Sequence, residues 1–398
     1  MNSKTPQRAV IFIPGFYGSA LKNSQTSERI WLTASEALWG SSTLALDEGG
    51  LAIPKTIDLV PDGILRKVRA IPFLWEEDIY DSILKKLEGR LGESARIIPF
   101  AYDWRRNNLK AVAQLGQLID ELLREGTPSI SIVAHSMGGL ITAYYLRYGT
   151  TDPATKSPRE TWEGLEKIDR VVLAGVPFRG SMLRLREMQS GARFGLNKTL
   201  VTREAASSFP SSYQLLPLIG DSLILSQNLA PIPHALSDPE NWAQHGWGLF
   251  GVPELSPTAL EHRRHFTERV LGQGKRFLQW INHPSEGTEK LPSRLLHIYG
   301  KGTLTLARAV VVKDDETNRP MLIFDESDMR KHYPETPPGL LLEDGDGSVT
   351  VESAALPEVL EAKFHSVSSF ETSNLHADIF KDPEVKNKVF AFLEEDPD

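Results

Sequence analysis

The chain has 398 residues, a net charge of −8, 40% hydrophobic residues and 24% charged residues, a composition typical of a folded globular protein. Acidic and basic residues are interspersed without a basic stripe, so no nucleic-acid partner is expected. The absence of cysteine excludes disulfides, thiolate metal sites and cysteine nucleophiles.

Two stretches bear on the expected compartment. Residues 1–8 are polar, and the apolar run 9–13 leads directly into a Pro-Gly turn, so this run is too short for an export signal and predicts the first core strand. Residues 127–146 carry no charge over about the length of a membrane helix. They include several serines and glycines and a histidine, which favour a buried strand, turn and helix. We therefore predict a cytoplasmic protein with no transmembrane segment.

Short apolar runs alternate with helical stretches from one end of the chain to the other. In chain order, strands are predicted at residues 9–13, 95–100, 129–133, 170–174 and 294–299. Helices are predicted at residues 79–91, 109–124, 139–147 and 383–393, with Pro383 in the first turn of the last one. This alternation predicts an α/β fold, in which helices cover both faces of a mostly parallel sheet.

Two long segments interrupt the alternation and predict insertions at one end of the sheet, because compact βα units need only short connections. The core is predicted to comprise residues 1–22, 77–177 and 293–398. Residues 23–76 form a first insertion, a candidate lipid-facing subdomain, and residues 178–292 form a cap and lid. Aromatic residues in the insertions, around Trp39, Phe73-Leu74-Trp75, Trp242 and Trp247, either line an acyl groove or belong to the core.

The sequence Ala134-His135-Ser136-Met137-Gly138 follows a predicted buried strand and precedes an apolar helix. This context is typical of the nucleophile elbow of α/β-hydrolases, in which a strained serine needs small neighbours at positions −2 and +2. Ser136 is therefore the predicted nucleophile.

A serine nucleophile needs a histidine base oriented by a carboxylate, and in α/β-hydrolases the order is Ser, acid, His. Of the ten histidines, His376 satisfies this order and lies in a predicted loop before the final helix. The acid is expected on a loop between the last predicted strand and this histidine. Asp344 and Asp346 both lie on such a loop, and spacing alone does not distinguish them.

The oxyanion hole needs two backbone amides. The residue after the nucleophile supplies one, predicted to be Met137, and the loop after the first strand supplies the other, predicted to be Phe16 with Tyr17 as the next choice. Tyr17 and Trp104 are the candidate substrate contacts. The sequence Tyr102-Asp103-Trp104-Arg105 either shapes the pocket or forms a structural ion pair.

No metal site or cofactor is predicted. The loop at Asp344 differs from a calcium-binding loop, since its sixth and twelfth positions hold Val349 and Ala355 instead of glycine and glutamate. The pair His262 and His265 has no evident third ligand.

Together, these motifs resemble the lecithin:cholesterol acyltransferase family over almost the whole chain. The matching segments are residues 14–19, 30–32, 102–105, 134–138, 175–177, 209–211, 299–302 and 344–349. In this family the catalytic acid directly follows the glycine of a Gly-Asp-x-Ser/Thr-Val motif, which corresponds to Asp346, and the lid corresponds to residues 192–208. The chain departs from the family at Ala134, where glycine is usual.

The resemblance implies a lipid ester as acyl donor and an acyl-serine intermediate. We therefore expect a lipid-ester hydrolase, with an O-acyltransferase that passes the acyl group to an alcohol as the alternative and a non-catalytic lipid-binding protein as a third reading. A transient contact with a lipid surface is also expected. The animal members are secreted and disulfide-bonded, so neither their compartment nor their sterol acceptor is carried over.

Overall fold

A computed structural model describes residues 8–32, 44–48, 50–51, 53, 56–71, 75–152, 158–194, 197–220, 222–251, 256–285, 287, 289–314 and 319–395. Its centre is a six-stranded sheet in which every neighbouring pair of strands is parallel. In sheet order the strands are β18 (Phe364–Thr372), β13 (Leu291–Gly300), β9 (Arg170–Ala174), β8 (Ser129–His135), β1 (Arg8–Ile13) and β7 (Ala95–Pro99).

Helices cover both faces of this sheet, because alternate side chains of its buried strands point into two separate cores. On β1, Val10 and Phe12 join one core, whereas Ala9, Ile11 and Ile13 join the other. The first core contains α2 (Asp81–Leu91), the 3₁₀ helix η3 (His376–Lys381) and α14 (Pro383–Glu394). The second contains α3 (Asn108–Arg124), α4 (Met137–Tyr148) and α5 (Glu163–Glu166). The predicted α/β-hydrolase fold is confirmed.

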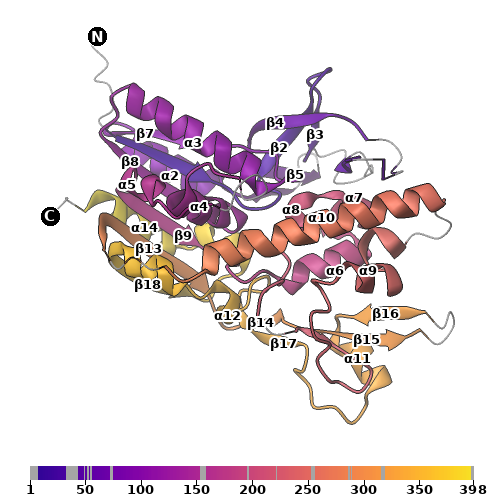
Figure 1. Ribbon diagram of the computed structural model, residues 1–398. Coiled ribbons are helices and arrows are strands. Elements are labelled where there is room, and N and C mark those ends of the chain that lie inside the picture. Colours follow the sequence, from indigo (N-terminus) through magenta and orange to yellow (C-terminus); the bar gives the residue numbers. More distant parts are fainter. Residues whose placement is uncertain are drawn as a thin grey trace.

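The cap elements lie to the right of the sheet in Figure 1, and the long helix α10 (Pro257–Asn282) extends from them back to α4. The other cap helices are α6 (Met182–Ser190), α7 (Arg203–Ser208), α8 (Pro210–Gln214), α9 (Pro239–Gln244) and the 3₁₀ helix η2 (Gly248–Gly251). A hairpin of β10 (Ala192–Phe194) and β11 (Asn197–Val201) connects α6 to α7. The division into a core and two insertions stays a prediction.

Several small sheets lie outside the central one. The first insertion contains the antiparallel sheet β3 (Arg29–Trp31), β2 (Ser19–Asn23) and β4 (Leu59–Ile64), and the hairpin β5 (Lys67–Ile71) and β6 (Trp75–Asp78). Beside the cap lie the sheet β12 (Ile224–Leu225), β15 (Ala309–Lys313) and β16 (Pro320–Ile323), and the pair β14 (Thr303–Leu306) and β17 (Leu342–Gly345). The remaining helices are α11 (Glu326–His332), α12 (Val351–Ala354) and α13 (Glu358–Lys363).

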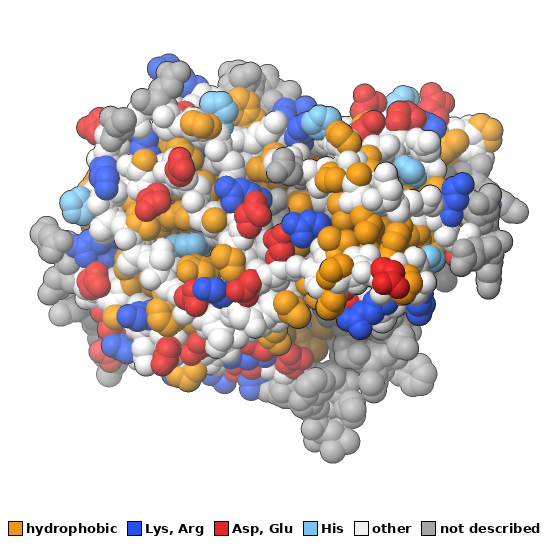
Figure 2. Space-filling model, turned by 90° about the horizontal axis from the view of Figure 1, so that it is seen from below, with side chains coloured by type: hydrophobic (Ala, Val, Ile, Leu, Met, Phe, Trp, Pro, Cys, Tyr) orange, Lys and Arg blue, Asp and Glu red, His pale blue; other side chains and the backbone are white. Residues whose placement is uncertain are grey.

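The uncharged stretch 127–146 forms β8, the turn at Ser136 and most of α4, and its side chains after residue 129 are buried in the two cores. Within the described part of the chain, no helix combines the length and the hydrophobicity that a membrane crossing requires. On the face seen in Figure 2, the described acidic and basic side chains are interspersed.

Trp242 and Trp247 are 0% and 1% exposed, so both belong to the core of the cap. Trp39, Phe73 and Leu74 lie outside the described residues. Of the predicted lid, residues 205–208 of α7 are buried, and Ala192, Leu200 and Val201 of the β10–β11 hairpin lie in the main core as well, so the lid stays a prediction.

Candidate active site

Ser136 occupies a sharp turn between β8 and α4. Its backbone φ of 52° and ψ of −124° are strained for a residue with a side chain, as the nucleophile elbow requires. A Cβ atom on Gly138 would lie 2.6 Å from the carbonyl oxygen of Pro14, so the turn needs glycine at position +2. Ala134, at position −2, is fully buried in the core.

The structure brings Ser136, His376 and Asp346 together from positions far apart in the chain. The Oγ of Ser136 lies 2.9 Å from Nε2 of His376, and Nδ1 of His376 lies 2.7 Å from Oδ2 of Asp346. Because a carboxylate only accepts hydrogen bonds, Nδ1 carries the proton and Nε2 is free to accept the hydroxyl proton of Ser136. This is the geometry of a general base oriented by an acid.

Asp346 directly follows β17, whereas Asp344 lies within this strand. Asp346 is 2% exposed, and its Oδ1 accepts hydrogen bonds from the amides of Ser348 at 2.9 Å and Val349 at 2.7 Å. Burial opposes ionisation of this carboxyl, but His376 and the two amides outweigh it and hold the pKa of Asp346 below its usual value. Asp344 is exposed and accepts a hydrogen bond from the amide of Gly302 at 2.6 Å instead.

His376 is the first residue of η3, between β18 and α14, rather than a loop residue as predicted. Its own amide donates to the carbonyl oxygen of Asp346 at 2.9 Å, so the base and the acid are joined through backbone as well as side chain. Its side chain is 16% exposed, which leaves the base open to a ligand on one side.

The two predicted oxyanion amides flank the nucleophile. Met137 is the first residue of α4, and the first amides of a helix have no intrahelical partner. Phe16 lies in a turn closed by a 3.0 Å hydrogen bond from the Gly18 amide to the Gly15 carbonyl oxygen. We call this turn, residues 15–18, the oxyanion turn, because it carries the predicted amide of Phe16. It passes directly over the nucleophile, since a Cβ on Gly15 would lie 2.8 Å from the Cβ of Ser136.

Aromatic rings pack against this turn from the first insertion and the cap. The ring of Phe16 lies 5.1 Å from that of Trp104 and 6.5 Å from that of Phe209, and the ring of Tyr17 lies 5.1 Å from that of Trp31. Trp104 is fully buried, and its indole donates to the carbonyl oxygen of Ser19 at 3.0 Å. In this arrangement Trp104 packs against the turn that carries Phe16, and its role as a substrate contact stays a prediction.

A buried cation also covers the turn. Arg184, on α6, is 5% exposed, forms an ion pair with Glu187 and places its guanidinium 4.3 Å from the ring centre of Phe16. It donates to the hydroxyl of Tyr17 at 3.2 Å. Burial raises the pKa of Tyr17, although Arg184 opposes this, so the phenol stays protonated. Through this hydrogen bond Tyr17 connects α6 to the oxyanion turn. The sequence did not indicate this contact.

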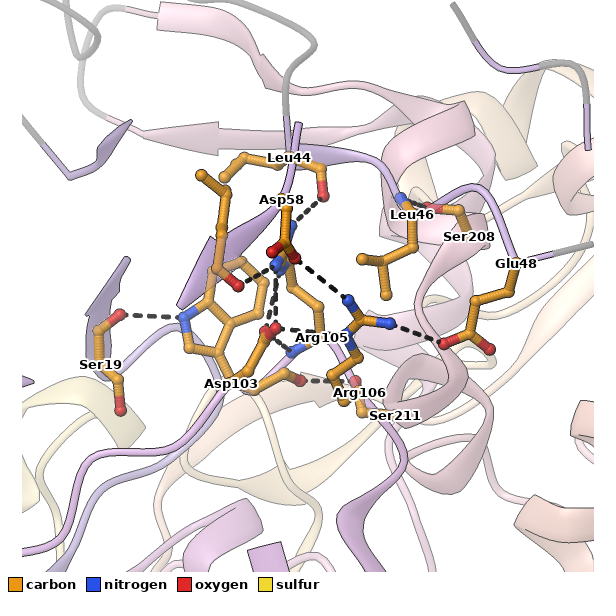
Figure 3. A network of polar contacts seen from close by, with 12 residues as sticks. Ser19, Leu44, Leu46, Glu48, Asp58, Asp103, Arg105, Arg106, Ser208 and Ser211 are labelled. Atoms are coloured by element: carbon orange, nitrogen blue, oxygen red, sulfur yellow. Dashed lines mark hydrogen bonds and ion pairs between the residues drawn. The ribbon is translucent and has the colours of Figure 1, made fainter. Parts of the chain in front are cut away.

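The segment Tyr102-Asp103-Trp104-Arg105 joins the core to the first insertion and the cap (Figure 3). The fully buried guanidinium of Arg105 forms two hydrogen bonds with the carboxylate of Asp103, at 2.9 and 2.8 Å. It also donates to the carbonyl oxygens of Leu44 at 3.0 Å and Leu59 at 3.3 Å. The structure therefore contains the ion pair, which holds in place the loop that carries Trp104, whereas the shaping of a pocket by this segment stays a prediction.

Comparison with known proteins shows which family and which relatives the chain resembles. The family described as lecithin:cholesterol acyltransferase matches residues 52–245, a range that includes Ser136 but neither Asp346 nor His376. The chain is therefore similar to this family over that range. It is 25% identical over 267 residues to human lysosomal phospholipase A and acyltransferase, and 26% identical over 264 residues to an uncharacterized protein of Saccharomyces cerevisiae.

These alignments cover 66% and 64% of this chain, but only 52% of the human relative and 34% of the yeast relative. The chain therefore spans about half the length of the first and a third of the second. A chain in the crystal structure of the Tle4-Tli4 complex aligns over 98% of both chains, with a TM-score of 0.57 and 13% sequence identity. This likeness concerns the fold alone.

Proposed function

We propose that this chain cleaves a carboxylic ester of a lipid through an acyl-serine intermediate. The observation that carries the proposal is the continuous hydrogen-bonded path from Asp346 through His376 to Ser136. The family match and the human relative support an ester hydrolase or acyltransferase enzyme, and the name of that relative supports a phospholipid as acyl donor.

In the first step, Oγ of Ser136 bonds to the ester carbonyl carbon while its proton passes to Nε2 of His376. The carbonyl oxygen gains the negative charge, and the amides of Phe16 and Met137 stabilise it. The C–O bond to the alcohol then breaks, and His376 gives its proton to the leaving oxygen. Water repeats these steps on the acyl-serine and releases the carboxylic acid.

Two features support a transient lipid surface as partner. Leu375, next to the proposed base, is 51% exposed, although large apolar side chains are usually buried. The partly buried aromatic rings of Phe16 and Tyr17, whose centres lie 4.3 Å apart, add apolar side chains on the turn over the nucleophile. The cytoplasmic location stays a prediction.

The alternative is an acyltransferase, in which an alcohol replaces water in the second half of the reaction. The same three side chains serve both reactions, so the choice depends on the acceptor that reaches the acyl-serine. The family description and the human relative's name support this alternative as well.

Labelling with a fluorophosphonate probe tests the enzyme proposal, since the probe reacts covalently with activated serines. We expect labelling of the wild type and none of Ser136→Ala. An unlabelled wild type, or equal labelling of the variant, would favour the non-catalytic lipid-binding reading. Mass spectrometry of products from mixed phospholipids and neutral lipids, with and without an added alcohol, then distinguishes hydrolysis from transfer.

A further inference from the structure

A second histidine lies beside the three proposed catalytic residues. His135 is 5% exposed, and its ring centre is 4.9 Å from that of His376. Its Nε2 lies 3.1 Å from the backbone carbonyl oxygen of His376, and its Nδ1 lies 2.7 Å from the hydroxyl of Tyr80. The same hydroxyl lies 3.0 Å from the amide of Gly15.

The chemistry of these groups allows one arrangement of protons. The carbonyl oxygen of His376 can only accept, so Nε2 of His135 must carry a proton. In a neutral imidazole Nδ1 is then an acceptor, so the hydroxyl of Tyr80 donates to it and accepts from the Gly15 amide. Burial lowers the pKa of His135 to about 3 and raises the pKa of Tyr80, in agreement with two neutral groups.

This arrangement leaves His135 no part in proton transfer, because both of its ring nitrogens are engaged. Its surroundings are apolar as well. The ring of Phe380 lies 5.7 Å from His135, and the ring of Phe12 lies 5.2 Å from Tyr80. Hydrogen bonds in such surroundings are stronger than in water and costly to leave incomplete. The three bonds therefore form a rigid connection.

The connection joins the three parts of the proposed site. Gly15 directly precedes Phe16, whose amide is the proposed oxyanion donor, His135 directly precedes the nucleophile, and its other partner is the backbone of the base. We propose that Tyr80 and His135 are positioning residues, which fix the oxyanion turn and His376 relative to Ser136 without contacting the substrate. This inference rests on the proposed hydrolase function.

Three single variants cut the connection at different bonds. Tyr80→Phe removes the bonds to Gly15 and His135. His135→Asn keeps an acceptor near the position of Nδ1 and loses the donor to His376. His135→Gln keeps a donor near the position of Nε2 and loses the acceptor for Tyr80. Tyr144→Phe is the matched control, because it removes a buried hydroxyl that donates to the carbonyl oxygen of Thr151 at 2.8 Å, outside this connection.

The readout is kcat and KM for a soluble p-nitrophenyl ester, with thermal melting to identify folded variants. We expect Tyr80→Phe to lower kcat about 10- to 100-fold, since small displacements of reacting groups cost rates of this order. KM should stay within about threefold of wild type, as should both constants of Tyr144→Phe. The double variant of Tyr80→Phe and His135→Gln should lose less than the product of the single losses, because both changes cut the same bond.

A kcat of Tyr80→Phe equal to that of Tyr144→Phe, or fully multiplicative losses in the double variant, would overturn the positioning role. Should Tyr80→Phe fail to fold, the two His135 variants decide, and wild-type kcat in both overturns the proposal. A wild type that fluorophosphonate does not label overturns the hydrolase function and this inference with it. A labelled wild type with unaffected variants overturns this inference alone.

Discussion

Replacing Asp346 by asparagine tests which carboxylate of the glycine-rich loop orients the base. The amides of Ser348 and Val349 both donate to Oδ1 of Asp346, so they would hold the oxygen of an asparagine and leave its NH₂ group facing His376. Two donors then meet at Nδ1, and the imidazole relieves this by moving its proton to Nε2. An imidazole protonated at Nε2 cannot accept the hydroxyl proton of Ser136.

We therefore expect Asp346→Asn to lower kcat by roughly 10⁴-fold, as a wrong histidine tautomer does in serine proteases, which corresponds to about 5.5 kcal/mol. Asp344→Asn is the matched control two residues away. Its asparagine oxygen can still accept from the amide of Gly302, and residue 344 is exposed, so kcat should stay within about threefold of wild type. The assay is p-nitrophenyl ester hydrolysis together with the rate of fluorophosphonate labelling. Equal losses in the two variants, or a loss below about tenfold in Asp346→Asn, would refute this reasoning.

Three further predictions concern Gly15, Arg105 and His135. Gly15→Ala should lower kcat about 100-fold, because its Cβ would lie 2.8 Å from that of the nucleophile, whereas Gly89→Ala, with no atom within 4 Å of the new Cβ, should leave kcat unchanged. Arg105→Lys should lower the free energy of unfolding in urea by about 3 kcal/mol, since lysine cannot keep the bidentate pair and both carbonyl bonds, and a loss near zero would contradict this. Burial depresses the pKa of His135 to about 3 from an unfolded value near 6.5, so its contribution to stability is present above pH 6.5 and is lost as the pH falls toward 3. Between pH 7 and pH 5 the wild type should therefore lose about 2 kcal/mol more unfolding free energy than His135→Asn, and parallel profiles would contradict this.

The fold follows from the sequence where a strand contains neighbouring apolar residues. Each of the five predicted strands does so, including the edge strand β7, which has a single buried residue, and each lies in the central sheet within a few residues of its predicted bounds. The sixth strand, β18, was not predicted. It lies at the edge of the sheet and its sequence Phe-His-Ser-Val-Ser-Ser-Phe-Glu-Thr is mostly exposed, so it lacks the continuous apolar run of a strand buried on both faces.

Some residues of the candidate site are indicated by local sequence patterns, and others are recognised only from contacts between distant parts of the chain. Ser136 and His376 could be predicted because the elbow and the place before the last helix are local patterns. The choice of Asp346 over Asp344 needed the family resemblance, because the two differ in burial and in their contacts with His376 and Gly302, which lie far away in the chain. Tyr80 could not be predicted, since its partner His135 is 55 residues away and only the packing of α2 against the sheet brings them together.

The oxyanion turn is the part of the proposed site that is contacted both from the sheet side and from the cap. From the sheet side, Tyr80 holds the amide of Gly15, and its surroundings belong to the core of α2 and α14. From the cap side, Arg184 and Phe209 pack on Phe16. The triad residues themselves stand at or near the ends of β8, β17 and β18, outside these cap contacts. The acid is nevertheless tied to the start of α6, because the hydroxyl of Ser181 donates to the carbonyl oxygen of Ser348, whose amide donates to Asp346. A displacement of α6 is therefore expected to alter both the oxyanion turn and the position of the acid.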